Sequence, residues 1–365
     1  MNDYKFWNEY LVKLKKEIKK LCAKKEKLYI DLHIHSNYSS DGKQSIKEIL
    51  NTTKNKGFDV IAITDHDSLN CYDELYDFVK DGFTNPLVIP GIEFTIDNKN
   101  YGSQCHILQL FVNPKDKDIL NNVDQNYKAM FNRSKIQFKR IKENQSLQEI
   151  FINNNINVSY DEYLNYLNLN NLLPEYDTLC SYLMTKFKSK EVTNFDIFEL
   201  LQKYNKKDCF NDRREFKEKR YNKLKEKYSL NDDNMYNTRF LLSMLAVREV
   251  DDDWWEKPSC GSLSVNSYGQ LTIDELNKKF PTYFAHPTEN KLSVVEDIIK
   301  EKKSIVGLEL NIRNNYNNID NFYKLLNKYH LNKIIGSDSH DATLKYYENM
   351  NFYIISSNEF LKILY

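Results

Sequence analysis

The stretch LYIDLHIHSNYSSDG, residues 28–42, places two histidines at the end of an apolar run and follows them with a polar turn. Residues 28–35 are expected to form a β-strand, on which His33 and His35, two positions apart, point to the same side. Gly42 lets the turn bend and return Asp41 toward that side. A buried, hydrogen-bonded histidine pair explains an isolated His-x-His equally well, so its meaning depends on the rest of the chain.

Other apolar runs end in the same way. The run VIAI at 60–63 is followed by TDHD, and placing three ionisable groups directly after a buried strand is costly unless each finds a partner. His66 as a metal ligand solves this, with Asp65 and Asp67 as acceptors for ring N–H groups. Glu93 follows a similar run, where a carboxylate is able to bridge two cations. Asp338 and His340 share a face after KIIG.

Imidazole and carboxylate are the ligands of zinc, manganese and iron. Either His106 or His286 taken singly is typical of a satisfied core histidine, but ligand-type residues at five separate strand ends are hard to explain by packing. These residues are more than one tetrahedral ion needs, so two or three ions are expected. Closely spaced ions of this kind bind phosphoryl oxygens and activate a bridging water. The chemistry predicted is hydrolysis of a phosphate ester. The nine candidates are His33, His35, Asp41, His66, Glu93, His106, His286, Asp338 and His340. The seventh histidine, His330, ends a polar helix without a companion and is predicted to be structural.

The short apolar runs alternate with segments of helical periodicity, such as Ser45–Lys56 and Asn70–Lys80. Repeated βα units with nearly continuous apolar strands predict a buried parallel sheet. In a βα barrel, the carboxyl ends of the strands form the catalytic face, which is where the candidate ligands fall. The predicted strands are Leu28–His35, Asp59–Thr64, Leu87–Phe94, Cys105–Val112, Thr282–Ala285, Ile305–Leu310, Lys333–Gly336 and Phe352–Ser356.

The regular alternation stops between the fourth and fifth predicted strands, and no glycine occurs from Ser103 through Cys260. We therefore expect residues 115–265 to form a helical insertion in a barrel made by residues 28–114 and 266–365. Its basic segment Lys203–Lys227 is either a solvated helix face or a contact surface for phosphate or nucleic acid. Residues 1–27 are predicted to contain an amphipathic helix with a basic outer face, docked on the barrel or on a dimer partner, with nucleic-acid contact as the alternative.

Bulk properties exclude several classes of protein. The 365 residues carry no net charge, so overall electrostatics favours neither nucleic acid nor membrane as partner. The N-terminus is too polar for a signal peptide, and the longest apolar stretch, around Phe240 to Val247, is too short to span a bilayer. Six cysteines without CxxC spacing are typical of reduced thiols, so a cytoplasmic location is expected.

These residues resemble the PHP family, named for polymerase and histidinol phosphatase. The resemblance lies in HIHSNYSSDG, AITDHDS, PGIEFT, CHILQLFV, FAHP, GLELN and GSDSH, in the family's order, over about residues 28–112 and 270–357. It implies an α/β fold, a distorted (βα)7 TIM-like barrel with a trinuclear site of Mn²⁺, Zn²⁺ or Fe²⁺. Asp41 stands one residue later than the commonest family spacing. A polar turn absorbs an extra residue easily.

The resemblance also implies how the ligands divide among the three divalent ions. One ion would be held by His33, His35, Glu93 and Asp338, a second by Glu93, His106 and His286, and a third by Asp41, His66 and His340. Asp338 and His340 are the ligands expected to act most directly in catalysis. Arg313, after the GLELN strand, is expected to join them by binding substrate phosphate, and Arg213 and Arg214 in the insertion are further candidates, although a surface arginine is the ordinary alternative at each position.

The function predicted is a metal-dependent phosphoesterase, acting on a nucleotide or the 5′ end of a short nucleic acid through a metal-bridging hydroxide. The alternatives are a phosphatase for a small metabolite such as histidinol phosphate, an amidohydrolase, and a non-catalytic metal-binding partner module. An amidohydrolase usually needs a lysine to bridge its metals, and here Glu93 stands in that place. No membrane partner is expected, whereas a homo-oligomer or a protein partner on the N-terminal helix or insertion is compatible with the sequence.

Overall fold

In the computed structural model the chain divides into two compact units, residues 1–127 with 269–365 and residues 128–268. The structure describes residues 2–39, 41–81, 85–98, 103–143, 145–170, 172–174, 179, 182–183, 185–186, 269–276, 278–287, 292–302, 304–311, 319–341 and 344–364. Among these, no helix is long and apolar enough to cross a membrane.

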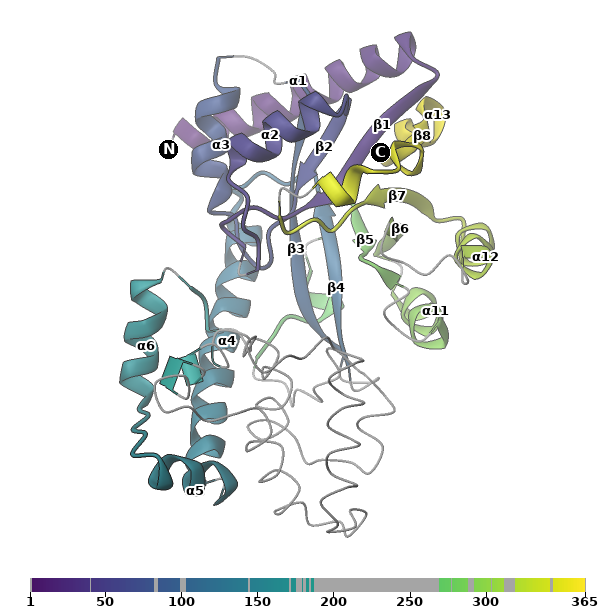
Figure 1. Ribbon diagram of the computed structural model, residues 1–365. Helices are drawn as coiled ribbons and strands as arrows, with labels where there is room; N and C mark the ends of the chain where they lie inside the picture. Colours follow the sequence, from purple (N-terminus) through teal and green to yellow (C-terminus); the bar gives the residue numbers. More distant parts are fainter. Residues whose placement is uncertain are drawn as a thin grey trace. The chain divides into compact units, whose positions relative to one another are not determined.

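The first unit contains one sheet of eight strands, in the order β7-β6-β5-β4-β3-β2-β1-β8 (Figure 1). All eight predicted strands are present. Their bounds are β1 Lys27–Ile34, β2 Val60–Ile63, β3 Leu87–Asn98, β4 Ser103–Leu110, β5 Thr282–Phe284, β6 Ile305–Asn311, β7 Asn332–Gly336 and β8 Ile354–Ser356.

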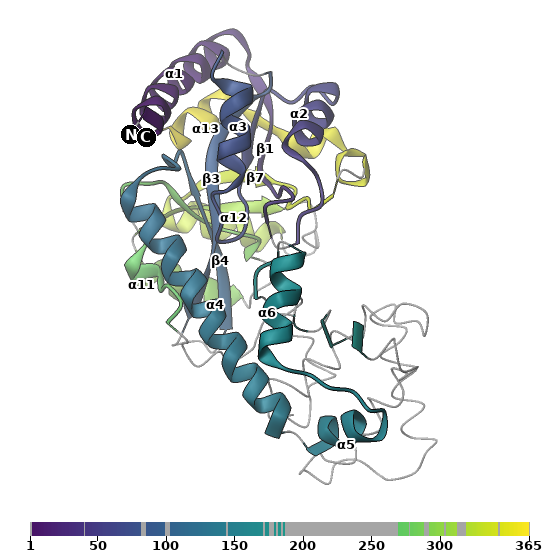
Figure 2. The same ribbon diagram turned by 90° about the vertical axis from the view of Figure 1, so that its left-hand side faces the viewer.

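The sheet is parallel over β1–β2–β3 and over β5–β6–β7, as the βα alternation predicts, but β4 runs antiparallel to both of its neighbours. The prediction of parallel pairing is wrong at β8, which pairs antiparallel with β1, and at β4. Strand β3 ends at Asn98 and β4 begins at Ser103, and a link this short joins only antiparallel strands, since a parallel crossover needs a dozen residues or more. β3 and β4 form a long hairpin (Figures 1 and 2).

The sheet curls into a nearly closed barrel. At the carboxyl end of β1, Ile34 forms a parallel bridge with Ser339, and the amide of Asp338 donates to the carbonyl of His33 at 2.9 Å. At its amino end, β1 instead pairs with the antiparallel strand β8. Closure therefore involves the ends of β1 and β7 where the histidine-rich segments lie, and the eighth strand stands beside the barrel's amino end.

Helices cover the outside of the sheet because their apolar faces need burial. In the first unit they are α1 Asn2–Lys24, α2 Ile46–Asn55, α3 Cys71–Val79, α11 Leu292–Glu301, α12 Ile319–Tyr329 and α13 Ser357–Ile363, with short 3-10 turns at Ile273–Glu275, Leu344–Tyr347 and Met350–Tyr353. Ser45 begins α2 with a capping box: its hydroxyl accepts from the amide of Glu48, whose carboxylate accepts from the amide of Ser45.

The N-terminal helix α1 packs on the barrel rather than standing free. Trp7, Leu14 and Ile18 are fully buried, and the Tyr10 hydroxyl donates to the carbonyl of Val88 at the start of β3. This supports the docked alternative for the amphipathic helix, and the basic face points away from the barrel. The described helices of the second unit are the greater part of α4 Lys117–Glu143, which begins in the first unit, α5 Gln145–Asn153 and α6 Tyr160–Leu169.

Candidate metal centre

The candidate ligands gather at the carboxyl ends of the strands. His33 is the last residue but one of β1 and His35 directly follows the strand, and both side chains are fully buried. Their Nε2 atoms are 3.0 Å apart, as expected for residues two apart on one face. Two imidazole nitrogens that point at the same place in the protein interior are arranged to bind one ion between them.

Glu93 is the centre of the cluster and has no exposed surface. Its two carboxylate oxygens lie within 3.2 Å of nitrogens from five different rings. The contacts are Oε2 to His33 Nε2 at 3.0 Å, to His35 Nε2 at 3.1 Å and to His66 Nδ1 at 3.2 Å, and Oε1 to His106 Nδ1 at 3.2 Å and to His286 Nε2 at 3.1 Å. A single carboxylate with this many imidazole neighbours is placed to serve more than one cation.

The side chains form overlapping groups with their ligand atoms within 4.8 Å of one another. These groups are His33, His35, Glu93 and Asp338; His35, Asp41, His66 and His340; and His66, Glu93 and His106. In addition, His106 Nδ1 and His286 Nε2 are 3.2 Å apart, and both contact Glu93 Oε1. All nine predicted ligand residues are thus brought together, in groups close to the division that the family resemblance implies.

The spacing fits divalent ions. Ligands that share a tetrahedral ion at bond lengths of about 2.0–2.1 Å lie roughly 3.3 Å from one another. The separations among the ring nitrogens and carboxylate oxygens match this value, for example 3.2 Å between His35 Nε2 and Asp338 Oδ1. The donor set of histidine with aspartate and glutamate suits zinc, manganese or iron. The residues present therefore fit the group that the donor chemistry implies.

Asp41 and His340 form the outer part of the cluster. His340 Nε2 lies 2.8 Å and His66 Nε2 3.5 Å from Asp41 Oδ2, and the Asp41 side chain is 36% exposed. The loop that delivers Asp41 requires a glycine after it, because a Cβ at Gly42 would lie 1.9 Å from the carbonyl oxygen of Ser36. The predicted role of Gly42 as a bend is thus explained by close backbone approach.

The carboxylates and imidazoles of the cluster shift one another's pKa values toward the charged forms. Burial works to raise the pKa of the Glu93 carboxyl, but His33, His66 and His106 hold that pKa well below its usual range. Burial works to lower the pKa of His33, yet Glu309 and Glu93 hold it well above its ordinary value. Without metal, imidazolium and carboxylate groups therefore neutralise one another, and with metal the ions take over the positive charge.

Glu309 is a functional residue that the sequence analysis missed. It is fully buried in β6, its Oε1 lies 2.9 Å from His33 Nδ1, and its Oε2 accepts from the amide of His286 at 2.6 Å. Accepting the Nδ1 proton leaves His33 Nε2 to face Glu93, which is the arrangement that orients a histidine ligand. The available signal was a carboxylate inside the apolar strand IVGLELN, which needs a buried partner.

Ser39 was also missed and is a hydrogen-bonding hub. Its hydroxyl lies 3.1 Å from His35 Nδ1, accepts from the amide of His66 at 3.1 Å and donates to Asp41 Oδ1 at 2.9 Å. These contacts satisfy the one donor and two acceptors of a hydroxyl. Ser39 therefore fixes the tautomer of His35 and ties the Asp41 loop to the His66 segment.

We expect Ser39→Ala to weaken the affinity for divalent ions by roughly 10- to 100-fold, because loss of such an orienting partner has effects of that size. The measurement is titration of the metal-free protein with Mn²⁺ by calorimetry. Ser45→Ala is the matched control, since it removes the hydroxyl that caps α2 and affects stability without touching the cluster. Equal Mn²⁺ affinities in Ser39→Ala and wild-type protein would show that Ser39 does not orient the ligands.

Asp65 and Asp67 have partners other than the ring N–H groups predicted for them. Asp65 accepts from the amide and hydroxyl of Ser36, both at 2.6 Å. Asp67 accepts from the side chain of Asn126 at 2.6 Å and from the amide of Thr95 at 3.2 Å. Both aspartates support the backbone that carries the histidines. At His33 and His35, the side chains that contact the ring Nδ1 atoms are those of Glu309 and Ser39.

Asn126, on α4, connects distant parts of the first unit beside the cluster. Its amide group donates to Asp67 and to the carbonyl of Thr95 at 2.9 Å, while its oxygen accepts from the amide of Leu271 at 2.8 Å. Asn126 lies where the chain leaves the first unit and Leu271 where it re-enters, and the hydrogen bonds of Asn126 connect both places to Asp67 after β2. No pattern in the sequence distinguishes this asparagine from the many others.

Backbone strain occurs at three of the segments that carry the cluster. Asp67, His286 and Asp338 have φ of 46°, 26° and 52°, in the left-handed region that residues with a side chain rarely adopt. Such conformations cost on the order of 1–3 kcal/mol each and persist where surrounding contacts enforce them. Here strain accompanies the turns that aim His286 and Asp338 into the cluster.

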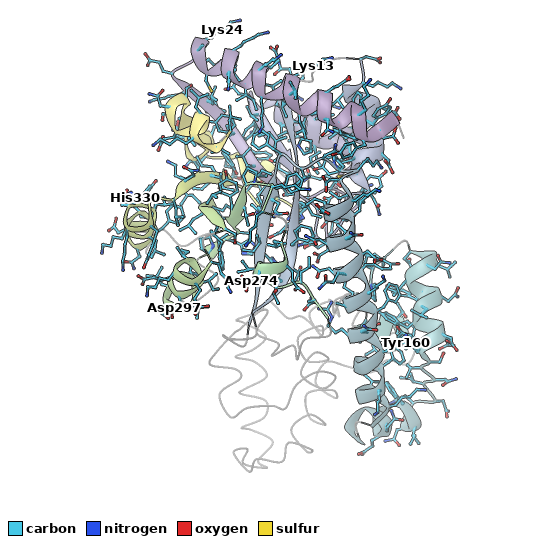
Figure 3. All side chains as sticks on the ribbon, turned by 180° about the vertical axis from the view of Figure 1, so that it is seen from behind. Lys13, Lys24, Tyr160, Asp274, Asp297 and His330 are labelled. Atoms are coloured by element: carbon cyan, nitrogen blue, oxygen red, sulfur yellow. The ribbon has the colours of Figure 1, made fainter. Side chains whose placement is uncertain are left out.

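The predicted substrate-binding arginines, Arg313, Arg213 and Arg214, lie outside the described residues. His330, predicted to be structural, follows α12 at the surface, as Figure 3 shows, and is not among the groups able to hold an ion. His330 has φ of 53°, as expected where a helix ends.

Comparison with known proteins relates part of the chain to this family. Residues 31–208 match the family model of the PHP domain, as the resemblance predicts for this part of the chain. Among curated proteins, none matches significantly. Similar solved structures include a protein described as a metal-dependent phosphoesterase from Bifidobacterium adolescentis (14% identity, TM-score 0.48, 85% of this chain and 87% of that one). An amidohydrolase from Chromobacterium violaceum with bound sulfate matches at 14% identity and TM-score 0.49, over 90% of this chain and 98% of that one. A two-domain protein from Bacteroides vulgatus, described as containing a predicted PHP-like metal-dependent phosphoesterase, matches at 11% identity and TM-score 0.34, over 87% of this chain and 53% of that one.

Proposed function

We propose that this chain, of which residues 31–208 match the PHP domain, is a metal-dependent phosphoesterase whose centre is organised around Glu93. The observation that supports this most strongly is the set of five ring nitrogens within 3.2 Å of the two Glu93 oxygens. When bound, closely spaced divalent ions act as Lewis acids on phosphoryl oxygens and lower the pKa of water at the site.

We propose that three ions, of Mn²⁺, Zn²⁺ or Fe²⁺, are held as follows. His33, His35, Glu93 and Asp338 would hold one, Glu93, His106 and His286 a second, and Asp41, His66 and His340 the third. Each set has its ligand atoms close together in the structure. The carboxylates offset the ionic charge, and Glu309 and Ser39 keep the Nε2 atoms of His33 and His35 directed inward.

Substrate is expected to approach from the exposed side of the cluster. The side chains of His33, His35 and Glu93 are fully buried, whereas those of Asp41, His106 and His340 are 36%, 29% and 19% exposed. The buried residues thus hold the ions firmly, and the partly exposed ones border the phosphate. His340 and Asp338 remain our candidates for the most direct part in the reaction, with Arg313, Arg213 and Arg214 as candidates for binding phosphate.

For the substrate we propose a nucleotide or the 5′ end of a short nucleic acid. Exposed lysines on the outer face of α1, among them Lys13, Lys16 and Lys20, favour a polyanion. A phosphatase for a small metabolite of the histidinol-phosphate type is the second candidate, because the same centre serves either substrate. The third is a partner module that binds metal without catalysis.

A panel of phosphate esters, assayed with Mn²⁺, tests this substrate class. The panel contains p-nitrophenyl phosphate, 5′- and 3′-nucleotides, 3′,5′-bisphosphates, 5′-phosphorylated RNA and DNA oligomers, and histidinol phosphate. We expect the highest kcat/KM on a nucleotide or a 5′-phosphorylated oligomer. Turnover of histidinol phosphate alone would select the metabolite phosphatase instead. If metal-loaded protein hydrolysed no ester of the panel, the non-catalytic binding module would be the remaining candidate.

Metal binding is expected to release protons at neutral pH. The pKa of His33 is raised well above its ordinary value by Glu309 and Glu93, so the metal-free imidazole is protonated at pH 7 and must lose a proton to become a ligand. The Mn²⁺ affinity should therefore rise as pH increases. Calorimetric titration in two buffers of different ionisation enthalpy measures the protons released. A binding enthalpy that is the same in both buffers would show that no proton is displaced.

A further inference from the structure

A cavity of about 700 Å³ lies at the opposite end of the barrel from the metal centre. Its walls come from the segment before β5 and from the starts of β6 and β7, including Pro281, Val306 and Asn332. The candidate ligands, by contrast, stand at the carboxyl ends of the strands. The cavity is therefore separate from the proposed metal centre, and its volume is within the range of ligand pockets.

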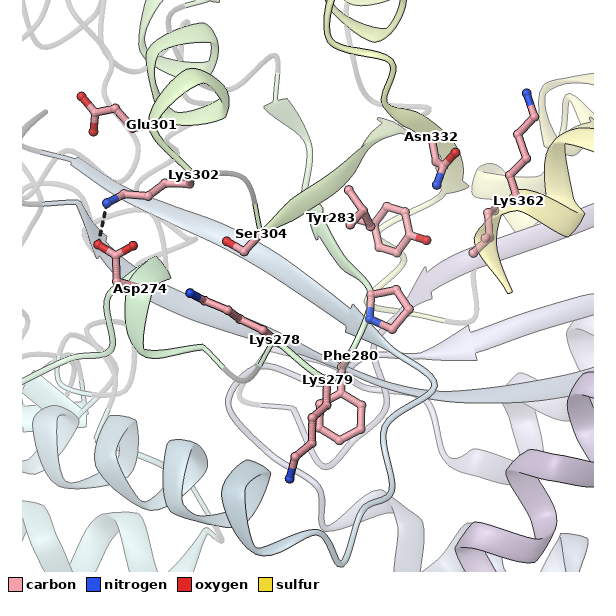
Figure 4. Close-up of a pocket in the computed structure, with 13 residues that line it drawn as sticks. Asp274, Lys278, Lys279, Phe280, Tyr283, Glu301, Lys302, Ser304, Asn332 and Lys362 are labelled. Carbon is pink, nitrogen blue, oxygen red and sulfur yellow. Dashed lines mark hydrogen bonds and ion pairs between the residues drawn. The ribbon is translucent and has the colours of Figure 1, made fainter. Parts of the chain in front are cut away.

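Four lysines gather around this cavity, Lys278, Lys279, Lys302 and Lys362, against two carboxylates, Asp274 and Glu301 (Figure 4). Lys302 pairs with Asp274, and Lys279 pairs with Asp118 outside the cavity. Lys278 and Lys362 have no carboxylate partner among the residues that the structure describes. The cavity thus has an excess of positive charge, and two of its ammonium groups are available for an anion.

Tyr283 in β5 provides a second and independent sign of a ligand. The residue is fully buried and lines the cavity, yet its hydroxyl has no hydrogen-bond partner among the described residues. The ring lies across β6 at Gly307, where a Cβ would come within 2.6 Å of it. Figure 4 shows the phenol directed toward the side of the cavity formed by Asn332 and Lys362. A buried hydroxyl without a partner is unfavourable unless something supplies one.

Part of the remaining wall is apolar. Phe280 lines the cavity, and Val306 is 37% exposed within an otherwise buried strand. Lysines on one side and apolar surface on another match a molecule with a phosphate group and a less polar body. We propose that this cavity, bordered by Tyr283, Lys278 and Lys362, binds a small phosphorylated organic molecule at a site distinct from the metal centre.

The test is calorimetric measurement of ligand binding to the protein of 365 residues, from which metal and chelator have been removed. The probes are AMP and glucose 6-phosphate, with adenosine and glucose as their phosphate-free counterparts. We expect at least one phosphorylated probe to bind and its neutral counterpart not to bind. Binding should persist in Glu93→Gln, once this variant is shown to fold, because the substitution lies in the metal centre and outside the cavity. If neither phosphorylated probe binds, if the neutral counterpart binds equally well, or if Glu93→Gln abolishes binding, the proposal is wrong.

Three variants locate the binding. Lys362→Ala should raise the Kd of the bound probe roughly tenfold and Tyr283→Phe about fivefold, as expected for loss of a charged and a neutral hydrogen bond. Lys300→Ala, on α11 and outside the cavity, is the matched control with unchanged Kd. Tyr283→Phe without ligand should be at least as stable as wild type in urea. A destabilised Tyr283→Phe, or a Kd unaffected by both cavity variants, would overturn the assignment.

Discussion

Glu93→Gln is expected to reduce kcat on any phosphate ester by roughly 10³-fold. This is the upper end of the effect seen when one group that stabilises developing charge is removed. The substitution keeps the size of the side chain but removes the charge to which five imidazoles point. Two ions would lose their common ligand, so the number of ions bound per chain should also fall. Activity assays combined with elemental analysis of the same preparations measure both effects.

The control for this substitution is Glu296→Gln, which removes a carboxylate from an ion pair with Lys328 on the outside of the barrel. It should retain wild-type metal content and activity. Glu93 is surrounded by buried positive partners, so the variant must also be shown to fold, by circular dichroism and urea unfolding. A folded Glu93→Gln with near wild-type turnover would mean that the reaction does not depend on the cluster.

Glu309→Gln is expected to weaken metal affinity and kcat by roughly 10- to 100-fold each, although Glu309 is not itself placed to hold an ion. The carboxylate accepts from His33 Nδ1 and from the amide of His286, and glutamine cannot accept with both of its terminal atoms. One of the two contacts must fail, so a histidine loses its orientation. Mn²⁺ titration and steady-state kinetics measure the change.

Glu309→Asp separates orientation from charge, because it keeps the carboxylate but withdraws it from His33. If Glu309 acts by geometry, the aspartate variant should be impaired as well, whereas a purely electrostatic role predicts recovery. Unchanged metal affinity in both variants would show that His33 is oriented without Glu309.

The parts of the site that could be predicted from the sequence are the ionisable residues that follow apolar runs. Histidines and carboxylates at the ends of apolar runs are conspicuous because ionisable groups there need partners, and the structure brings all nine candidates together. All eight strands were also predicted, since short apolar runs bounded by polar turns are a local signal.

The remaining features depend on contacts between distant parts of the chain. The antiparallel course of β4 follows from the length of one connection. Ser39 and Asn126 are ordinary polar residues that no local pattern distinguishes, and only tertiary structure places their side chains beside His35 and Asp67. Glu309 gave a signal, a carboxylate within an apolar strand, but the identity of its partner required the fold.

The most direct test of the central claim is phosphate-ester hydrolysis by the same protein before metal removal, after it, and after reconstitution with Mn²⁺. If the cluster around Glu93 is a hydrolytic metal centre, activity should disappear with the ions and return in proportion to the number restored. Hydrolysis that continues unchanged in metal-free protein, or a fully reconstituted protein that hydrolyses no phosphate ester, would contradict the claim.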